Sequence, residues 1–132
     1  MTVFVDTSAI YASLDRNETS HTTARAAFAE LIERQTLLIT NNYVVLESVA
    51  LLQNRVGLAA VRALHEDILP SMTIDWVSEE QHSASVAMLS TAGRRKLSLV
   101  DCVSFATMRA RGIRTALSLD PHFREQGFEL LP

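Results

Sequence analysis

Two patterns of apolar residues alternate along this chain. Short apolar runs such as Val3-Phe4-Val5 and Leu37-Leu38-Ile39 are typical of strands that are buried on both faces. The segments between them carry apolar residues at the spacing of a helix. The short runs predict strands at residues 2–6, 37–39, 72–77, 115–119 and 128–131. The longer segments predict helices at residues 7–14, 22–34, 42–56, 58–69, 79–92 and 98–111, and a single helical turn at 120–127.

Capping residues support these helix boundaries. Asn41 can cap the helix that follows it, and Ser78 with Gln81 forms the capping-box pattern at the start of another. Pro70 cannot continue a helix, and Gly112 is suited to end one. The chain is therefore expected to alternate strand and helix throughout.

This alternation predicts an α/β fold: a central parallel sheet of four to five strands, flanked by helices on both faces and joined by right-handed crossovers. A length of 132 residues and a hydrophobic content of 48% suit one domain over residues 1–132. In such sheets, ligands bind beyond the carboxyl ends of the strands. The four glycines are far apart and form no glycine-rich phosphate loop, which removes most support for a nucleotide-binding function.

Glu47 is the most unusual charged residue in the pattern. Its neighbours at helical spacing, Tyr43, Val44, Ala50 and Leu51, are all apolar, so its carboxylate is expected to face inward. An ionised carboxylate without a partner costs several kcal/mol to bury, and a cap cannot explain a residue in the middle of a helix. Glu47 is therefore a candidate ligand for a cation.

Three aspartates accompany Glu47, each beside an apolar segment. Asp6 is the last residue of the first predicted strand, Asp101 follows Leu97-Ser98-Leu99-Val100, and Asp120 follows the fourth strand. Each has a structural explanation as well, because Asp6 and Asp120 can cap helices and Asp101 can complete a capping box. If the carboxylates converge, their oxygens suit hard cations such as Mg²⁺ and Mn²⁺.

The charge distribution bears on the partner. A net charge of −3 argues against binding nucleic acid by bulk electrostatics, but it allows a local basic rim around an acidic site. Arg94 and Arg95 precede Asp101 in a predicted loop and are candidates for contact with a substrate phosphate, although a solvated loop would look similar. No segment is long and apolar enough to span a membrane and no signal peptide is evident, so we expect a cytoplasmic protein. The single cysteine, Cys102, lies among apolar residues and is expected to pack in the core.

The acidic motifs resemble those of a known family. Four segments look like the acidic motifs of PIN domains, and in length and order the chain is similar to VapC-type toxins of prokaryotic toxin–antitoxin modules. These segments are Val3-Phe4-Val5-Asp6-Thr7-Ser8-Ala9, Leu46-Glu47, Leu97-Ser98-Leu99-Val100-Asp101 and Leu117-Ser118-Leu119-Asp120-Pro121-His122-Phe123. Each motif alone is weak, but the ordered set is specific and covers essentially the whole chain.

The resemblance assigns roles residue by residue. The three most constant acidic positions of the family fall on Asp6, Glu47 and Asp101, which would hold the principal metal directly or through water. The fourth falls on Asp120, with the hydroxyl position two residues earlier on Ser118. These two residues would hold a second metal or position the attacking water.

Residues around the substrate are assigned in the same way. Thr7 or Ser8 matches the small hydroxyl residue after the first aspartate, and we predict Thr7, with Arg94 and Arg95, to bind substrate. Histidine is not needed as a base, and His122 is the only histidine close enough to an acidic motif to be a candidate for substrate contact.

What the resemblance implies is a single PIN-like nuclease domain with Mg²⁺- or Mn²⁺-dependent endoribonuclease activity. It implies hydrolysis of RNA phosphodiester bonds, a homodimer, and neutralisation by a cognate antitoxin. Two other functions stay open. One is a non-catalytic module whose acidic pocket binds a partner peptide. The other is a haloacid-dehalogenase-type phosphatase, which usually has a second aspartate where this chain has Ser8.

Overall fold

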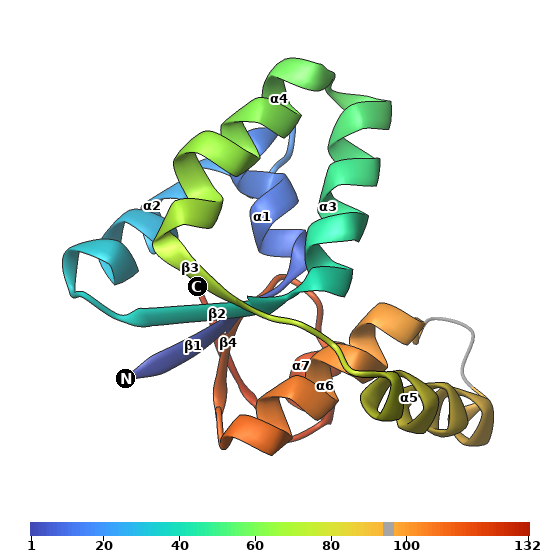
Figure 1. Ribbon diagram of the computed structural model, residues 1–132. Helices are drawn as coiled ribbons and strands as arrows, with labels where there is room; N and C mark the ends of the chain where they lie inside the picture. The colour runs from blue at the N-terminus through green and yellow to red at the C-terminus, as the bar shows by residue number, and fades with distance from the viewer. Residues whose placement is uncertain (94–96) are drawn as a thin grey trace.

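The structure is organised around a sheet of five parallel strands (Figure 1). This computed structural model describes residues 1–93 and 97–132, and the strand order in the sheet is β3-β2-β1-β4-β5. The strands are β1 Thr2–Val5, β2 Leu37–Asn41, β3 Met72–Asp75, β4 Thr115–Leu117 and β5 Glu129–Leu131. The predicted parallel α/β sheet is therefore confirmed.

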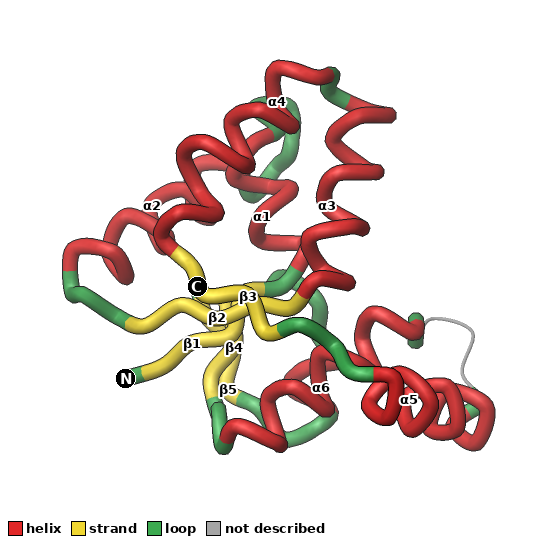
Figure 2. The backbone as a smooth tube through the Cα atoms, viewed as in Figure 1, coloured by secondary structure: helices red, strands yellow, loops and turns green. Residues whose placement is uncertain are grey.

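Helices cover both faces of this sheet. They are α1 Thr7–Leu14, α2 His21–Glu33, α3 Asn42–Arg55, α4 Leu58–Ala63, α5 Glu79–Ala92, α6 Leu99–Arg111 and α7 His122–Glu125. Helices α1 to α4 lie on one side of the strands and α5 to α7 on the other, as both backbone views show (Figure 1, Figure 2). Right-handed crossovers require this division, because the chain proceeds from β1 in one direction to β3 and then resumes beyond β1 with β4.

The reversal beside β1 fixes where a ligand would bind. In open α/β sheets, the crevice for a ligand opens at the carboxyl ends of the two strands that flank such a switch point. Here those strands are β1 and β4, which pair directly. Asp6 follows β1 and Ser118 follows β4, so both lie at the switch point.

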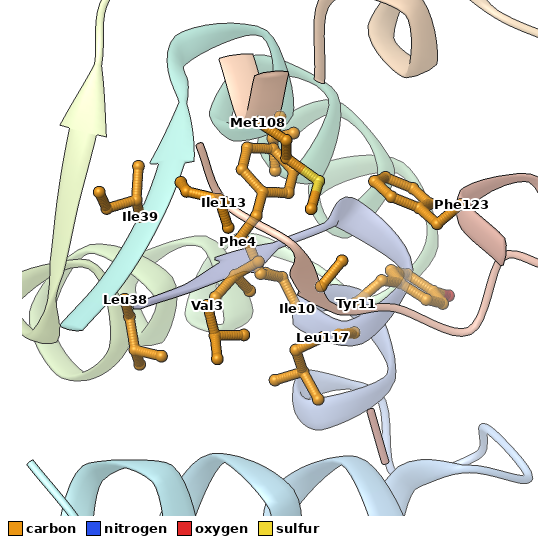
Figure 3. Packing of buried hydrophobic residues seen from close by; sticks show 14 of the residues in the cluster. Val3, Phe4, Ile10, Tyr11, Leu38, Ile39, Met108, Ile113, Leu117 and Phe123 are labelled. Atoms are coloured by element: carbon orange, nitrogen blue, oxygen red, sulfur yellow. The ribbon is translucent and has the colours of Figure 1, made fainter. Parts of the chain in front are cut away.

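A continuous hydrophobic core holds the sheet and helices together (Figure 3). All three apolar residues of β1, Val3, Phe4 and Val5, are 0% exposed. Phe123 of α7 is also 0% exposed, and its ring lies 6.2 Å from that of Phe4 and 5.0 Å from that of Phe105. Burying one such side chain contributes about 1.5–3 kcal/mol, so α7, although short, is firmly anchored.

Several predicted boundaries differ from the structure for identifiable reasons. The predicted helix 58–69 continues past α4 as a π-helical turn, η1 Leu64–Ile68, and a 3₁₀ turn, η2 Leu69–Ser71. Pro70 lies in that last turn and has no amide hydrogen with which to extend an α-helix. Strand β3 ends before Val77, because the amide of Val77 donates to the Asn42 side chain at 2.7 Å. Strand β4 ends at Leu117, where the chain turns into the site described below.

Two further sequence predictions can be compared with the structure. Cys102 is unpaired and 0% exposed, as expected for core packing. Over residues 1–93 and 97–132, none of the helices combines the length and apolar character that crossing a bilayer requires.

Candidate active site

Polar side chains from three chain segments meet at the carboxyl ends of β1 and β4. Asp6 precedes α1, Asp101 lies in the first turn of α6, and Ser118 to His122 connect β4 to α7. Asp6 and Asp101 lie at the amino ends of α1 and α6, where a helix carries a partial positive charge. This charge favours the ionised form of each carboxylate by about 0.3–1 kcal/mol.

Asp6 is the most buried carboxylate of the site, with 4% of its surface exposed. Its Oδ2 accepts hydrogen bonds from Ser8 Oγ at 2.7 Å and from Ser118 Oγ at 2.9 Å. The pKa of Asp6 is raised from its ordinary value of 3.8 to about 6. Burial is the main cause and the charge of Asp101 adds to it, whereas the hydrogen bonds from the two serine hydroxyls act in the opposite direction. Among the described residues Oδ1 has no hydrogen-bond partner, so one oxygen is left for a ligand.

The two serines also hold the loop after β4. Ser8 Oγ accepts the amide of Leu119 at 2.9 Å, and Ser118 Oγ accepts the amide of Asp120 at 3.0 Å. Each hydroxyl thus donates to Asp6 and accepts from the backbone, which uses both of its functions. This network fixes the Asp120 segment relative to Asp6.

Asp101 serves as a cap and as a member of the cluster. Its Oδ2 accepts the amide of Ser98 at 3.1 Å, and Ser98 Oγ accepts the amide of Asp101 at 3.1 Å, which completes a capping box. Burial raises the pKa of Asp101, and the charge of Asp120 raises it further, whereas hydrogen bonds with Ser98 and the nearby His122 lower it. The capping explanation is therefore confirmed for this residue, while its role in a metal site stays a prediction.

Asp120 and His122 form the outer part of the cluster. The amide of His122 donates to Asp120 Oδ1 at 2.9 Å, which closes a tight turn through Pro121. His122 Nδ1 lies 3.0 Å from Asp120 Oδ1 and 3.9 Å from Asp101 Oδ2. One ligand atom from each of these three residues lies within 4.8 Å of the others, as the donor atoms of one metal site would.

Glu47 lies apart from this network. It occupies the second turn of α3 and is half-buried, so the sequence pattern overestimated its burial. The reason is that Ala50, one of its apolar neighbours at helical spacing, is exposed, as is the adjacent Leu46 at 71%. Within the described residues the Glu47 carboxylate forms no hydrogen bond or ion pair, although α3 packs against both α1 and α6, which carry Asp6 and Asp101.

The structure gives less information about the residues predicted to bind substrate, which are Thr7, Arg94 and Arg95. Thr7 is buried, and its hydroxyl has no hydrogen-bond partner among the described residues. Ser8 is instead the residue whose hydroxyl contacts Asp6. Arg94 and Arg95 lie outside the described residues. Their roles, like those of the carboxylates, stay predictions.

The donor set suits a divalent cation. Asp6, Asp101 and Asp120 repel one another, and in the described part of the chain His122 is the only basic side chain that approaches them closely. Carboxylate and hydroxyl oxygens are typical ligands of Mg²⁺ and Mn²⁺. The sequence analysis considered His122 only for substrate contact and not as part of the acidic cluster. The sequence Asp120-Pro121-His122 could have indicated its place there, since an Asp-Pro-X turn returns the third residue towards the aspartate.

The chain was compared with known proteins. The PIN-domain family model matches residues 3–129. Over 127 residues the chain is 32% identical to the 23S rRNA-specific endonuclease VapC20 from two strains of Mycobacterium tuberculosis, with 96% of this chain and 95% of that protein covered. The crystal structure of Mycobacterium tuberculosis VapC20, described as a sarcin-ricin loop cleaving toxin, has a TM-score of 0.86 with 98% and 99% of the two chains covered.

A more distant neighbour shares the fold alone. The crystal structure of FitAcB from Neisseria gonorrhoeae is 20% identical, with a TM-score of 0.68 and 100% and 97% of the two chains covered. The match of nearly the whole chain to the family model, together with the sheet order and the acidic cluster at β1 and β4, makes this protein a member of the PIN-domain family.

Proposed function

We propose that this protein is a Mg²⁺- or Mn²⁺-dependent endoribonuclease, the toxin of a VapC-type toxin–antitoxin pair. The observation that carries the proposal is the meeting of Asp6, Asp101 and Asp120 at the switch point of the sheet. Similarity over nearly the full length to VapC20 supports the same reaction class.

In this proposal the residues of the chain bind and orient the reacting groups. A bound divalent cation would supply positive charge to the scissile phosphate and make an attacking water more acidic. Asp6, Asp101 and Asp120 hold that cation, and Ser118 and Ser8 keep the Asp6 carboxylate in one orientation. Glu47 acts from its half-buried position, directly or through water.

We propose a structured RNA loop as the substrate. VapC20 is named for 23S rRNA and for the sarcin-ricin loop, and the similarity covers nearly all of both chains. Arg94, Arg95 and Thr7 are proposed to contact the RNA on the basis of their sequence positions. In-line attack by water would leave a 5′-phosphate and a 3′-hydroxyl.

The test uses the purified full-length chain and a synthetic sarcin-ricin loop hairpin, with the same hairpin carrying a permuted loop as control. We expect a single cut that requires Mg²⁺ or Mn²⁺, stops with EDTA and leaves a 5′-phosphate. Asp101→Asn should lower the rate roughly a hundredfold or more, since it removes a carboxylate of the cluster. Asp67→Asn, an exposed residue of η1, is the matched control and should cut normally.

Other outcomes distinguish the competing functions. If both hairpins stay intact while p-nitrophenyl phosphate is hydrolysed, the protein is a phosphatase. If neither is cleaved at any metal concentration, a non-catalytic binding module is the better description. Cutting of both hairpins at many positions would leave the nuclease assignment standing and refute the loop specificity.

Partnership and location belong to the same proposal. We propose a cytoplasmic homodimer that a cognate antitoxin neutralises. Exposed apolar side chains are available for such contacts, since Leu46 is 71% and Trp76 is 72% exposed. Light scattering should give twice the chain mass at micromolar concentration, and co-expression with the product of an adjacent small reading frame should relieve growth arrest. A monomer mass would refute the dimer but not the antitoxin.

A further inference from the structure

His122 is the one residue of the acidic cluster that could offer nitrogen to a cation. Its side chain is 12% exposed, and Nδ1 itself is buried. The ring points this nitrogen at the carboxylates of Asp120 and Asp101, at 3.0 Å and 3.9 Å. No role for a histidine follows from the acidic motifs themselves.

The position of His122 is fixed by its neighbours. Its amide is held by Asp120 Oδ1, and the next residue, Phe123, is fully buried against Phe4 and Phe105. The backbone therefore cannot carry the imidazole away from the carboxylates without breaking core contacts. A ligand that is held in place before binding loses little conformational entropy when it binds.

The geometry of Nδ1 fits coordination better than hydrogen bonding. Although Nδ1 lies 3.0 Å from Asp120 Oδ1, it makes no hydrogen bond of acceptable geometry among the described residues. Ligand atoms about 2.1 Å from one octahedral ion lie about 3.0 Å apart when adjacent and about 4.2 Å apart when opposite. The 3.0 Å separation from Asp120 Oδ1 equals the value for adjacent ligands, and the 3.9 Å separation from Asp101 Oδ2 is closer to the value for opposite ligands.

We propose that His122 Nδ1 is a direct ligand of the cation held by Asp101 and Asp120, so that the site is a mixed nitrogen and oxygen site. This rests on the proposed function in one respect, which is that the cluster binds a divalent cation. Imidazole nitrogen binds first-row transition ions better than Mg²⁺. His122 therefore raises the preference of this site for Mn²⁺ over Mg²⁺.

The alternative is that His122 only pairs with Asp120 and positions it. The two roles differ in one measurable property, which is the spin coupling between bound Mn²⁺ and a histidine nitrogen. Electron spin-echo modulation of the Mn²⁺-loaded full-length protein detects that coupling directly. The measurement on the unaltered protein, with and without ¹⁵N-histidine labelling, needs no mutation and so no assumption about folding.

We expect nitrogen modulation that changes with the ¹⁵N label, is lost in His122→Asn and is retained in His65→Asn. His65 is an exposed histidine of η1 and is the matched control. In competition titrations, His122→Asn should lower the ratio of Mn²⁺ to Mg²⁺ affinity about tenfold or more.

Mn²⁺ bound without nitrogen modulation would overturn the inference, and so would modulation that persists in His122→Asn. These outcomes can be separated from failure of the proposed function. Cleavage of the RNA hairpin without nitrogen coupling refutes only the ligand role. Nitrogen coupling in a protein that leaves RNA intact refutes only the nuclease function.

Discussion

Asp6 lowers the stability of the folded protein at neutral pH and also supplies a carboxylate to the candidate metal site. Its carboxylate is buried and receives two serine hydroxyls, yet its pKa is still raised to about 6. The folded protein therefore holds the Asp6 proton more tightly than the unfolded chain does. The contribution of protonated Asp6 to the free energy of unfolding is fully present below about pH 3.8 and is lost as the pH rises through 6.

The first prediction concerns this loss of stability with rising pH. Without metal, stability to urea should fall between about pH 4 and 6, with up to about 3 kcal/mol attributable to Asp6, because one pKa unit is worth about 1.4 kcal/mol. Asp6→Asn should flatten the fall and be more stable than the unaltered protein at pH 7.5. Asp101, whose pKa is also raised, keeps part of the slope. Exposed Asp67→Asn should leave the slope unchanged, and an unchanged slope in Asp6→Asn would contradict the prediction.

The acidic residues of the candidate site could be predicted from the sequence, but their surroundings could not. Asp6, Asp101 and Asp120 could be identified because each follows a distinct apolar segment. The burial of Glu47 was overestimated, because helical periodicity cannot distinguish apolar residues in the core from apolar residues on an exposed face. The proximity of His122 to Asp101 could not be predicted from the sequence, because only the fold of the loop brings the imidazole ring to Asp101.

At the level of elements, Asn41 ties together the two helices that carry Glu47 and Asp101. It is 0% exposed and caps α3 by accepting the amide of Val44 at 2.9 Å. Its Nδ2 reaches α6, where it lies 3.4 Å from Ser104 Oγ and 3.2 Å from Thr107 Oγ1. One side chain thus sets the end of β2, the start of α3 and the distance to α6.

The second prediction compares Asn41 with a simpler cap. Asn41→Ala should cost roughly 2–4 kcal/mol, the sum of a lost cap and of buried hydroxyls left with fewer partners. Ser78→Ala removes the exposed cap of α5 and should cost only about 1 kcal/mol. Urea unfolding of both variants measures the difference. Equal losses would mean that the bonds from Asn41 to α6 add nothing to stability.

Element boundaries were predictable where chemistry marks them and less so elsewhere. The capping boxes begin α5 and α6, and the left-handed Gly112 ends α6, where the sequence indicated. The segment after α4 was read as one helix because its apolar spacing continues through the π and 3₁₀ turns. The early ends of β3 and β4 depend on side-chain bonds from other elements, which a local pattern does not contain.

At the scale of the whole molecule, the acidic cluster joins parts of the chain that are far apart in sequence. Asp6 lies between β1 and α1, whereas Asp101 lies in α6, on the other side of the sheet, and Asp120 lies in the loop between β4 and α7 (Figure 1). The repulsion among these carboxylates therefore acts between the two layers. A cation that binds all of them should stabilise the entire fold rather than one loop.

The third prediction is a metal-linked rise in melting temperature at neutral pH. A cation at a hundred times its dissociation constant stabilises by about 2.7 kcal/mol, which for a domain of this size is on the order of 10 °C. Asp101→Asn should lose most of this shift, because it removes a carboxylate of the cluster. Glu47→Gln should keep more of the shift than Asp101→Asn, since among the described residues Glu47 forms no hydrogen bond or ion pair with the cluster. The same variant should nevertheless cut RNA poorly. Calorimetry with Mn²⁺ and with EDTA measures both shifts. If millimolar Mn²⁺ does not change the melting temperature of the unaltered protein, these carboxylates do not share a cation.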